Sequence, residues 1–174
     1  MNEYPAVDHS HLLPSAQALV GLPTAERIQH IRADHWIGYP HALKTVNRLE
    51  MLFNWPKKQR MPNLLLIGPT NNGKSMIIER FRRLHLPSSS IDQEHIPVLC
   101  VQMPSDPSVL RFYVAMLAAL GAPLRPNLRL PTLEQLALSL LRSVEVKMLV
   151  IVSCTIYWLV TAVIAVNFST YCAF

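Results

Sequence analysis

The chain has 174 residues, of which 51% are hydrophobic, enough for one globular domain of ordinary size with its own core. A surplus of 16 Lys and Arg over 11 Asp and Glu gives a net charge of +5, a mild bias toward polyanions that does not decide between nucleotides and nucleic acid. Cys100, Cys154 and Cys172 lie far apart, form no C-x-x-C pair and follow no cleavable signal sequence, which favours a cytoplasmic chain with reduced thiols.

The segment before the first strand is expected to be a flexible arm followed by helices. Residues 1–23 are largely polar and punctuated by proline, and Thr24–Ile31 begins like a short helix with Thr24 as its N-cap. Trp36–Pro40 is too apolar for a free linker, and Ala42–Phe53 has apolar residues at helical spacing. We therefore place the start of the folded domain at residue 24.

The next segment matches the phosphate-binding pattern G-x-x-x-x-G-K-[ST] without a mismatch. Asn63–Ile67 before it is typical of a buried parallel strand, and Met76–Phe81 after it continues as a helix that should end near Leu84. The order of strand, loop and helix disfavours the alternative of a glycine-rich turn with a solvated lysine. The candidate phosphate-binding residues are Gly68, Pro69, Thr70, Asn71, Asn72, Gly73, Lys74 and Ser75.

Each residue type in this loop has a chemical reason. Gly68 and Gly73 are expected to let the backbone fold around phosphates, so that successive N–H groups and the start of the next helix face the anion. Lys74 should bridge the terminal phosphates of a nucleotide, and the Ser75 hydroxyl should ligate Mg²⁺. The loop therefore predicts a nucleotide site.

The rest of the chain alternates strands and helices. Pro97–Met103 is expected to be a second strand, and Pro107–Leu120 a helix ended by Gly121. A further helix over Leu133–Val144 should be capped by Thr132 and Gln135, and Lys147–Ile151 should enter as a third strand. This order predicts an α/β fold with a parallel sheet, although the chain supplies fewer strands than P-loop proteins usually have.

Other chemistry finds little support in the sequence. The seven histidines do not fall at metal-ligand intervals, and no G-x-S-x-G elbow or other local signature of a covalent nucleophile occurs. The guanine-reading pattern N-K-x-D is absent, and no acidic magnesium partner or substrate lid of a small-molecule kinase is visible.

Several of these segments together resemble the TniB proteins of bacterial transposons, over about Pro14 to Ile151. The resemblance implies an AAA+ ATPase related to Mu B and TnsC, with a three-layer parallel sheet that is incomplete at the C-terminus and a partial domain over residues 24–151. It also implies ATP and Mg²⁺, assembly into homo-oligomers on DNA, and a partner transposase of the TniA type. The segments that carry it are Arg27–Ile28, Trp36–Tyr39, Asn63–Ser75, Val101–Pro104 and Lys147–Ile151.

The same resemblance suggests a place for the adenine base. In AAA+ relatives a short apolar segment ahead of the first strand packs on the base, and Ile37, Gly38 and Tyr39 hold the matching position. A buried structural aromatic is the alternative interpretation of Tyr39.

The end of the third strand departs from the family pattern. Relatives have an acidic pair there, followed by leucine, histidine and asparagine, and the two carboxylates support magnesium and orient the attacking water. Here the strand runs into Val152, and no Asp or Glu follows Glu145, so we assign no catalytic residue and expect impaired ATP hydrolysis. The codons permitted from Val152 onward, read one base out of frame, can spell ELHN, so we expect a one-base deletion near Ile151 and a frameshifted tail over residues 152–174.

Two further alternatives stay open. No charged residue occurs from Met148 to Phe174, and residues 148–166 approach the ~20 apolar residues that span a bilayer, so the chain could instead be a membrane-tethered P-loop protein of unknown role. Two basic clusters are consistent either with solvated faces and helix ends or with contacts to the DNA backbone. Their members are Lys57, Lys58, Arg60, Arg80, Arg82 and Arg83.

Overall fold

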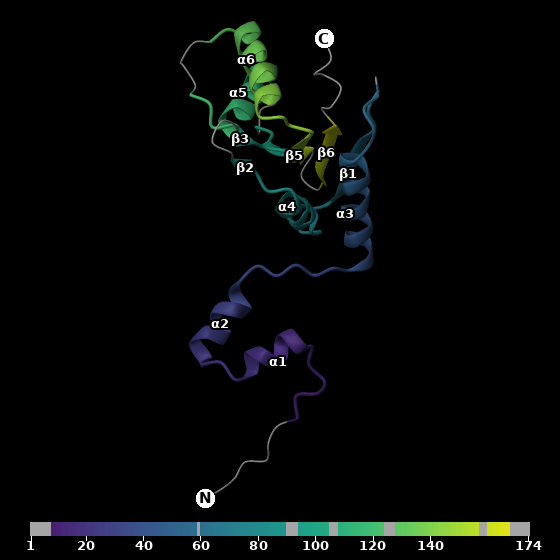
Figure 1. The fold of residues 1–174 in the computed structure, drawn as a ribbon, viewed down its shortest axis with the longest axis vertical. Helices are drawn as coiled ribbons and strands as arrows, with labels where there is room; N and C mark the ends of the chain where they lie inside the picture. The colour runs from purple at the N-terminus through teal and green to yellow at the C-terminus, as the bar shows by residue number, and fades with distance from the viewer. Residues whose placement is uncertain are drawn as a thin grey trace, which may run out of the picture. The chain divides into compact units, whose positions relative to one another are not determined.

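A computed structural model describes residues 8–58, 60–89, 94–104, 108–123, 128–156 and 160–167, with side chains as far as Val152. The protein is a mixed α/β chain that divides into two compact units, Met1–Ile37 and Gly38–Phe174 (Figure 1). The first unit holds helices α1 (Pro14–Val20) and α2 (Thr24–Arg32). The elements of the second unit are α3 (Pro40–Phe53), β1 (Asn63–Pro69), α4 (Lys74–Leu84), β2 (Ser88–Ser89), β3 (Glu94–His95), β4 (Val98–Gln102), α5 (Val109–Ala119), α6 (Leu130–Ser143), β5 (Met148–Ile156) and β6 (Val160–Asn167).

The first unit contains more helix than the sequence led us to expect. Helix α1 lies inside the segment predicted as a flexible arm, and neither α1 nor α2 has a buried residue. Thr24 is the first residue of α2 and Pro23 is its N-cap, so the predicted cap is wrong by one position. Proline has no N–H to donate and suits the start of a helix. Residues 1–7 lie outside the described part of the chain.

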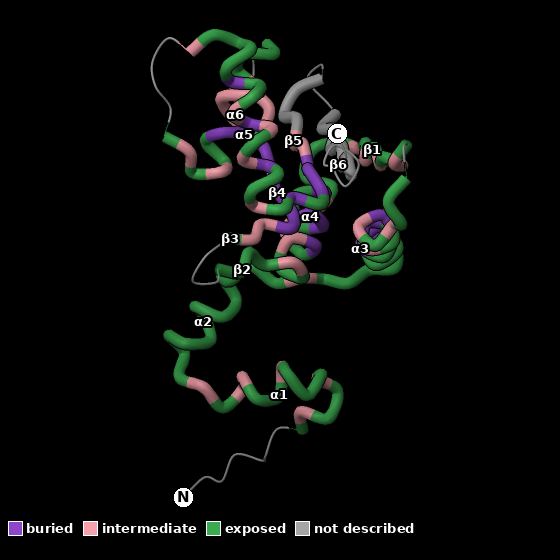
Figure 2. Tube along the Cα trace, turned by 45° about the horizontal axis from the view of Figure 1, so that its top comes forward, coloured by how far each residue is buried: buried purple, intermediate pink, exposed green. Residues whose placement is uncertain are grey.

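The core of the second unit joins β4 and β5 to helices α5 and α6. These elements contain many of the buried residues, drawn in purple in Figure 2, and helices α3 and α4 contain a second group. The helix α6 begins at Leu130 with Arg129 as its N-cap, so the capping box predicted for Thr132 and Gln135 is wrong. Pro131 in the first turn explains the earlier start, because proline is favoured at the beginning of a helix. The buried core residues are Leu99, Val101, Met116, Leu117, Leu133, Ala137, Leu141, Val146 and Leu149.

The strands of the main sheet lie in the order β1-β6-β5-β4. Strands β4 and β5 are parallel, as predicted, from the pair Val98 and Met148 to the pair Gln102 and Val152. Strand β6 is antiparallel to both β1 and β5, so the expectation of an entirely parallel sheet is wrong. Antiparallel neighbours need only a short connection, whereas a further parallel strand would need a crossover of a dozen or more residues.

Strand β1 is an edge strand. The prediction that it is a buried strand is therefore wrong. Its residues alternate between exposed and half-buried, and Leu65 and Ile67 are 53% and 60% exposed. A continuous apolar run does not distinguish a central strand from an edge strand, because both keep the same β-forming residues.

The apolar tail forms strands where it is described. Strands β5 and β6, and not a helix, take up most of residues 148–166, the segment whose apolar length suggested a membrane span. Among the described residues, no helix is both long and apolar enough to cross a membrane. Branched residues such as Val160, Val163 and Ile164 favour strand. The expected shift of reading frame concerns the coding DNA and stays a prediction.

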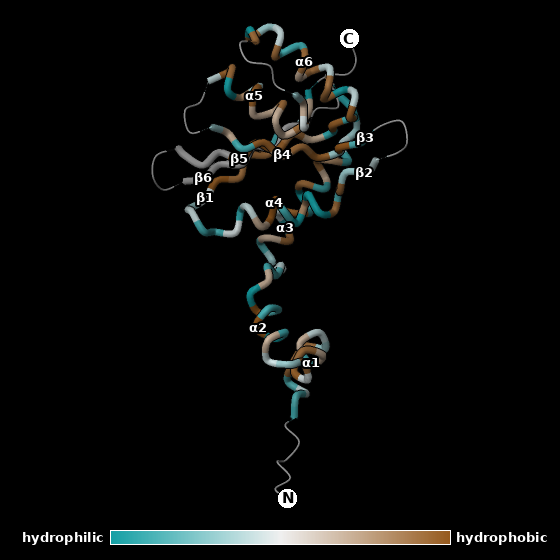
Figure 3. The backbone as a smooth tube through the Cα atoms, turned by 90° about the vertical axis from the view of Figure 1, so that its left-hand side faces the viewer, coloured by the Kyte–Doolittle hydropathy of each residue, from teal (hydrophilic) through white to brown (hydrophobic). Residues whose placement is uncertain are grey.

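Helices α3 and α4 pack together on the side of the sheet away from α5 and α6 (Figure 3). The rings of Phe53 and Phe81 meet edge to face at 6.1 Å, and Phe81 is completely buried. At the end of α4, His85 Nε2 lies 2.8 Å from the Glu50 carboxylate of α3. These contacts fix α4, and with it the loop that precedes it, against the rest of the unit.

Candidate functional site

The loop between β1 and α4 turns on a residue with a left-handed backbone. Gly73 has φ 72° and ψ 6°, and its carbonyl oxygen accepts the first helical hydrogen bond from Ile77 at 3.0 Å. Asn71 also has a positive φ of 61°, a conformation that asparagine tolerates better than most residues. The loop therefore needs glycine at position 73.

Gly68 does not have the backbone conformation that the sequence suggested. It lies within β1, its φ is not in the left-handed region, and a Cβ added there would be 3.6 Å from Asn72 Nδ2, an ordinary contact. The expectation that Gly68 adopts a backbone closed to other residues is therefore wrong, because the strand continues through it to Pro69.

Lys74 is a buried cation at the start of α4. Its side chain is 6% exposed, and its ammonium donates to the carbonyl oxygens of Gly68, at 2.8 Å, and of Pro69. A buried ammonium needs such partners, because the loss of water disfavours an unpaired charge. The lysine thus ties the beginning of the helix to the end of the strand before the loop.

A cavity of about 450 Å³ lies at this loop. One wall is the loop and the first turn of α4, and the other is made by Gln102, at the carboxyl end of β4, and its register partner Val152 within β5. No carboxylate lines the cavity among the residues that the structure describes. The lining residues are Thr70, Asn71, Asn72, Gly73, Lys74, Ser75, Met76, Gln102 and Val152.

The donors at this cavity fit an anion. The free N–H groups at the start of an α-helix, together with its dipole and a lysine ammonium, attract phosphate. For a magnesium ion the fit is weaker, because the loop offers the exposed Ser75 hydroxyl and no carboxylate. In the described part of the chain, no three His, Cys, Asp or Glu residues are grouped to hold a metal.

The structure brings one of the three predicted adenine contacts to the loop. The Tyr39 hydroxyl lies 3.3 Å from the position that a Cβ on Gly73 would occupy, and the Tyr39 side chain is 41% exposed. Tyr39 is thus close to the loop and is not a buried structural aromatic. Ile37 belongs to the first unit, where it is exposed.

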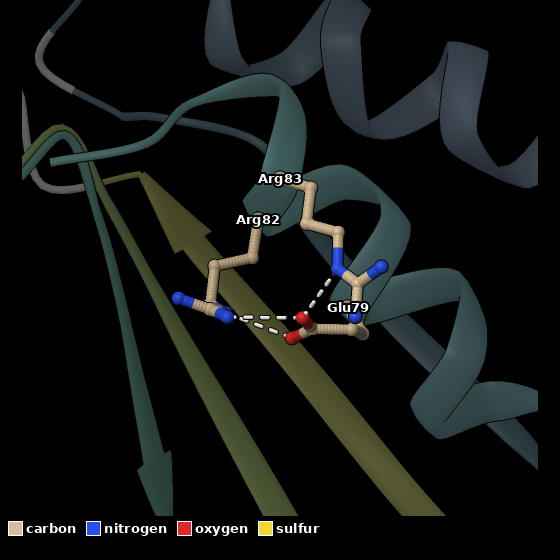
Figure 4. Close-up of polar contacts among 3 residues, drawn as sticks. All are labelled: Glu79, Arg82 and Arg83. Carbon is tan, nitrogen blue, oxygen red and sulfur yellow. Dashed lines mark hydrogen bonds and ion pairs between the residues drawn. The ribbon is translucent and has the colours of Figure 1, made fainter. Parts of the chain in front are cut away.

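The basic residues at the end of α4 pair with an acid on the same helix (Figure 4). Arg82 donates to both oxygens of the Glu79 carboxylate, at 2.8 and 2.9 Å, and Arg83 Nε donates to one of the same oxygens at 2.8 Å. These hydrogen bonds, first from Arg82 and then from Arg83, lower the pKa of Glu79 to about 2. Glu79 therefore offsets part of the positive charge that the sequence suggested for DNA.

On the wall of the cavity opposite the loop, sequence reasoning missed Gln102 and reached Val152 only through the family resemblance. Gln102 and Val152 are 28 and 78 positions away from Lys74 along the chain, and only the parallel pairing of β4 and β5 sets them side by side. One signal was present: Gln102 is the polar last residue of an otherwise apolar strand, and ligands of α/β sheets bind at the carboxyl ends of strands.

The family model described as Bacterial TniB protein matches residues 27–152. The matched segment begins in α2 and ends within β5, so it includes the loop between β1 and α4 and every lining residue of the cavity. No curated protein and no solved structure matches the chain.

Proposed function

Because the chain belongs to the TniB family, a family of transposition-associated proteins, we propose that it is an ATP-binding protein of DNA transposition. In this role it selects a target and regulates a partner transposase of the TniA type. The observation that carries the proposal is the loop itself: left-handed Gly73 delivers Lys74 and the start of α4 to a cavity of about 450 Å³.

The proposed fold is that of a P-loop NTPase of the AAA+ type. Three features support it. The chain runs from β1 through the loop into α4, and strands β4 and β5 are parallel. The helix pairs α3–α4 and α5–α6 lie on opposite sides of the sheet (Figure 3). In this arrangement the nucleotide lies at the carboxyl ends of β1 and β4, in the cavity that the loop, Gln102 and Val152 line.

The triphosphate is the ligand that the loop residues suit. Backbone N–H groups of residues 71–75 face its phosphates, the Lys74 ammonium exchanges its carbonyl partners for phosphate oxygens, and Tyr39 lies on the side from which the nucleoside enters. Magnesium arrives with the nucleotide, held by phosphate oxygens and the Ser75 hydroxyl.

The protein binds ATP without turning it over efficiently. Val152 lines the cavity where relatives of the P-loop class place the carboxylate that supports magnesium. A valine neither ligates the metal nor accepts a proton, so the site retains phosphate binding and lacks the groups for hydrolysis.

The proposed partners follow from the family and the charge pattern. Lys57, Lys58, Arg60 and Arg80 lie exposed around the second unit and suit contacts with the DNA backbone, which would weaken steeply with salt. Oligomers of this chain on DNA, and a transposase of the TniA type, complete the proposal.

Calorimetric titration with ATP and Mg²⁺ tests the central part of this proposal. Lys74→Ala should lower the affinity at least about tenfold, because a hydrogen bond to a charged group contributes ~1.5–3 kcal/mol. Lys44→Ala removes the same charge from an exposed position on α3 and should leave the affinity unchanged. Equal affinities for Lys74→Ala and the unaltered protein, or no binding by the folded protein, would refute the proposal.

A further inference from the structure

Gln102 ends strand β4 with its side chain on the face of the sheet that looks toward α4. Val101 belongs to the core with α5 and α6, and successive side chains of a strand point to opposite faces. Cys100, on the same face as Gln102, lies close enough to Arg82 and Glu79 of α4 for their charges to act on it. Gln102 is two positions further along this face, at the cavity that the start of α4 lines.

The neighbouring strand places an apolar side chain, Val152, at this level. Val152 is the register partner of Gln102, and the Met103 N–H donates to the Val152 carbonyl oxygen at 2.8 Å, so the end of β4 is held beside Val152. Gln102 is therefore the polar side chain that the strand wall contributes to the described lining of the cavity.

The geometry points to Gln102 as the residue that recognises the terminal phosphate of the bound nucleotide, by donating from its side-chain amide. This inference rests on the proposed function, because it assigns a role within the same site. The loop and Lys74 hold the phosphates from one side, and a donor on the opposite wall can reach only the part of the ligand that projects across the cavity. A diphosphate lacks that group, so Gln102 would separate a triphosphate from a diphosphate.

The neutral amide gives this recognition a property that a carboxylate would not have. An amide carries two N–H donors and needs no metal between itself and a phosphate, whereas a carboxylate repels phosphate unless a cation bridges them. The preference for triphosphate is therefore expected to persist without Mg²⁺.

The test is a titration of the full chain with the non-hydrolysable triphosphate AMP-PNP and with ADP, each in Mg²⁺ and in EDTA. Gln102→Ala should lower the affinity for AMP-PNP about tenfold in both conditions and should change the affinity for ADP less than about twofold. Gln102→Met, which keeps the length of the side chain, should behave like Gln102→Ala. Gln135→Ala, an exposed glutamine on α6, should change nothing.

The outcomes separate this inference from the proposed function. Suppose that Lys74→Ala abolishes nucleotide binding. If Gln102→Ala and Gln102→Met then lower the affinities for AMP-PNP and ADP by the same factor, or lower neither, the assignment of Gln102 is overturned and the nucleotide site stands. If the protein binds neither nucleotide, or binds both without need of Lys74, both proposals fall. Circular dichroism and thermal unfolding of each variant confirm that the fold is retained.

Discussion

The ammonium of Lys74 lies 2.8 Å from the carbonyl oxygen of Gly68, so the cation that begins α4 is bonded to the strand that precedes the loop. The bond closes the loop between two fixed elements, because β1 is paired with β6 and α4 is packed on α3. In this arrangement the backbone N–H groups of the loop are positioned before any ligand arrives, which lowers the entropic cost of binding.

The left-handed turn predicts that alanine costs more stability at one glycine of the loop than at the other. Gly73→Ala should destabilise the protein by ~1–2 kcal/mol, because φ of 72° is unfavourable for alanine and the new Cβ would lie 3.3 Å from the Tyr39 hydroxyl. Gly68→Ala should change the stability by less than about half as much, because its Cβ meets only ordinary contacts. Urea unfolding of both variants measures the difference, and equal losses would contradict the loop geometry.

The missing carboxylate predicts a gain of metal dependence. Val152→Asp places an acid on the wall of the cavity beside Gln102, where it can support Mg²⁺ bound to phosphates. The ratio of ATP affinities with and without Mg²⁺ should rise at least about tenfold, since one new charged contact contributes ~1.5–3 kcal/mol. Val152→Asn is the control, because asparagine has the shape of aspartate and no charge. If the ratio of ATP affinities with and without Mg²⁺ were equal in the two variants, the metal would lie elsewhere.

The pairing of Glu79 predicts a pH dependence of stability. Its pKa falls from an ordinary 4.5 to about 2 in the folded protein, so the ion pairs stabilise the fold above pH 4.5 and this contribution is lost as the pH falls toward 2. Glu79 is about one-third exposed, so solvent and salt screen the pairs and the contribution should stay below ~1 kcal/mol. The advantage of the unaltered protein over Glu79→Gln in urea unfolding should therefore shrink between pH 5 and 3. An advantage that grew on acidification would contradict the pairing.

The position of β6 predicts that the sheet depends on the tail. Strand β6 pairs with both β1 and β5, so a chain ending at Ile156 leaves β1 without its partner. Hydrogen exchange at the β1 amides of residues 64–67 should accelerate by several orders of magnitude in that variant. A chain ending at Asn167 retains β6 and should protect these amides as before. Unchanged protection in the shorter chain would show that β1 is held by other contacts.

The sequence predicted the parts of the site that are contiguous in the chain. Helices α3 and α4 were readable from their apolar spacing, and the loop was readable from the order of strand, glycine and lysine. The parallel pairing of β4 and β5 also followed from the alternation of helices and strands. Local periodicity and local backbone chemistry determine these features.

The remaining features depend on contacts between distant segments. The backbone conformation expected of Gly68 was wrong because the end of β1 is set by its pairing with β6. The antiparallel course of β6 was missed because an apolar run fits strand and membrane helix equally. Gln102 and Val152 enter the site only through the register of two strands. A single sequence does not specify such a register.

The most direct measurement of the central claim is a crystal structure of the chain with AMP-PNP and Mg²⁺. We predict that the phosphates lie against the backbone N–H groups of residues 71–75 and that the Lys74 ammonium moves from the carbonyl oxygens of Gly68 and Pro69 to phosphate oxygens. A nucleotide bound elsewhere, with Lys74 still bonded to both carbonyl oxygens, would contradict the account.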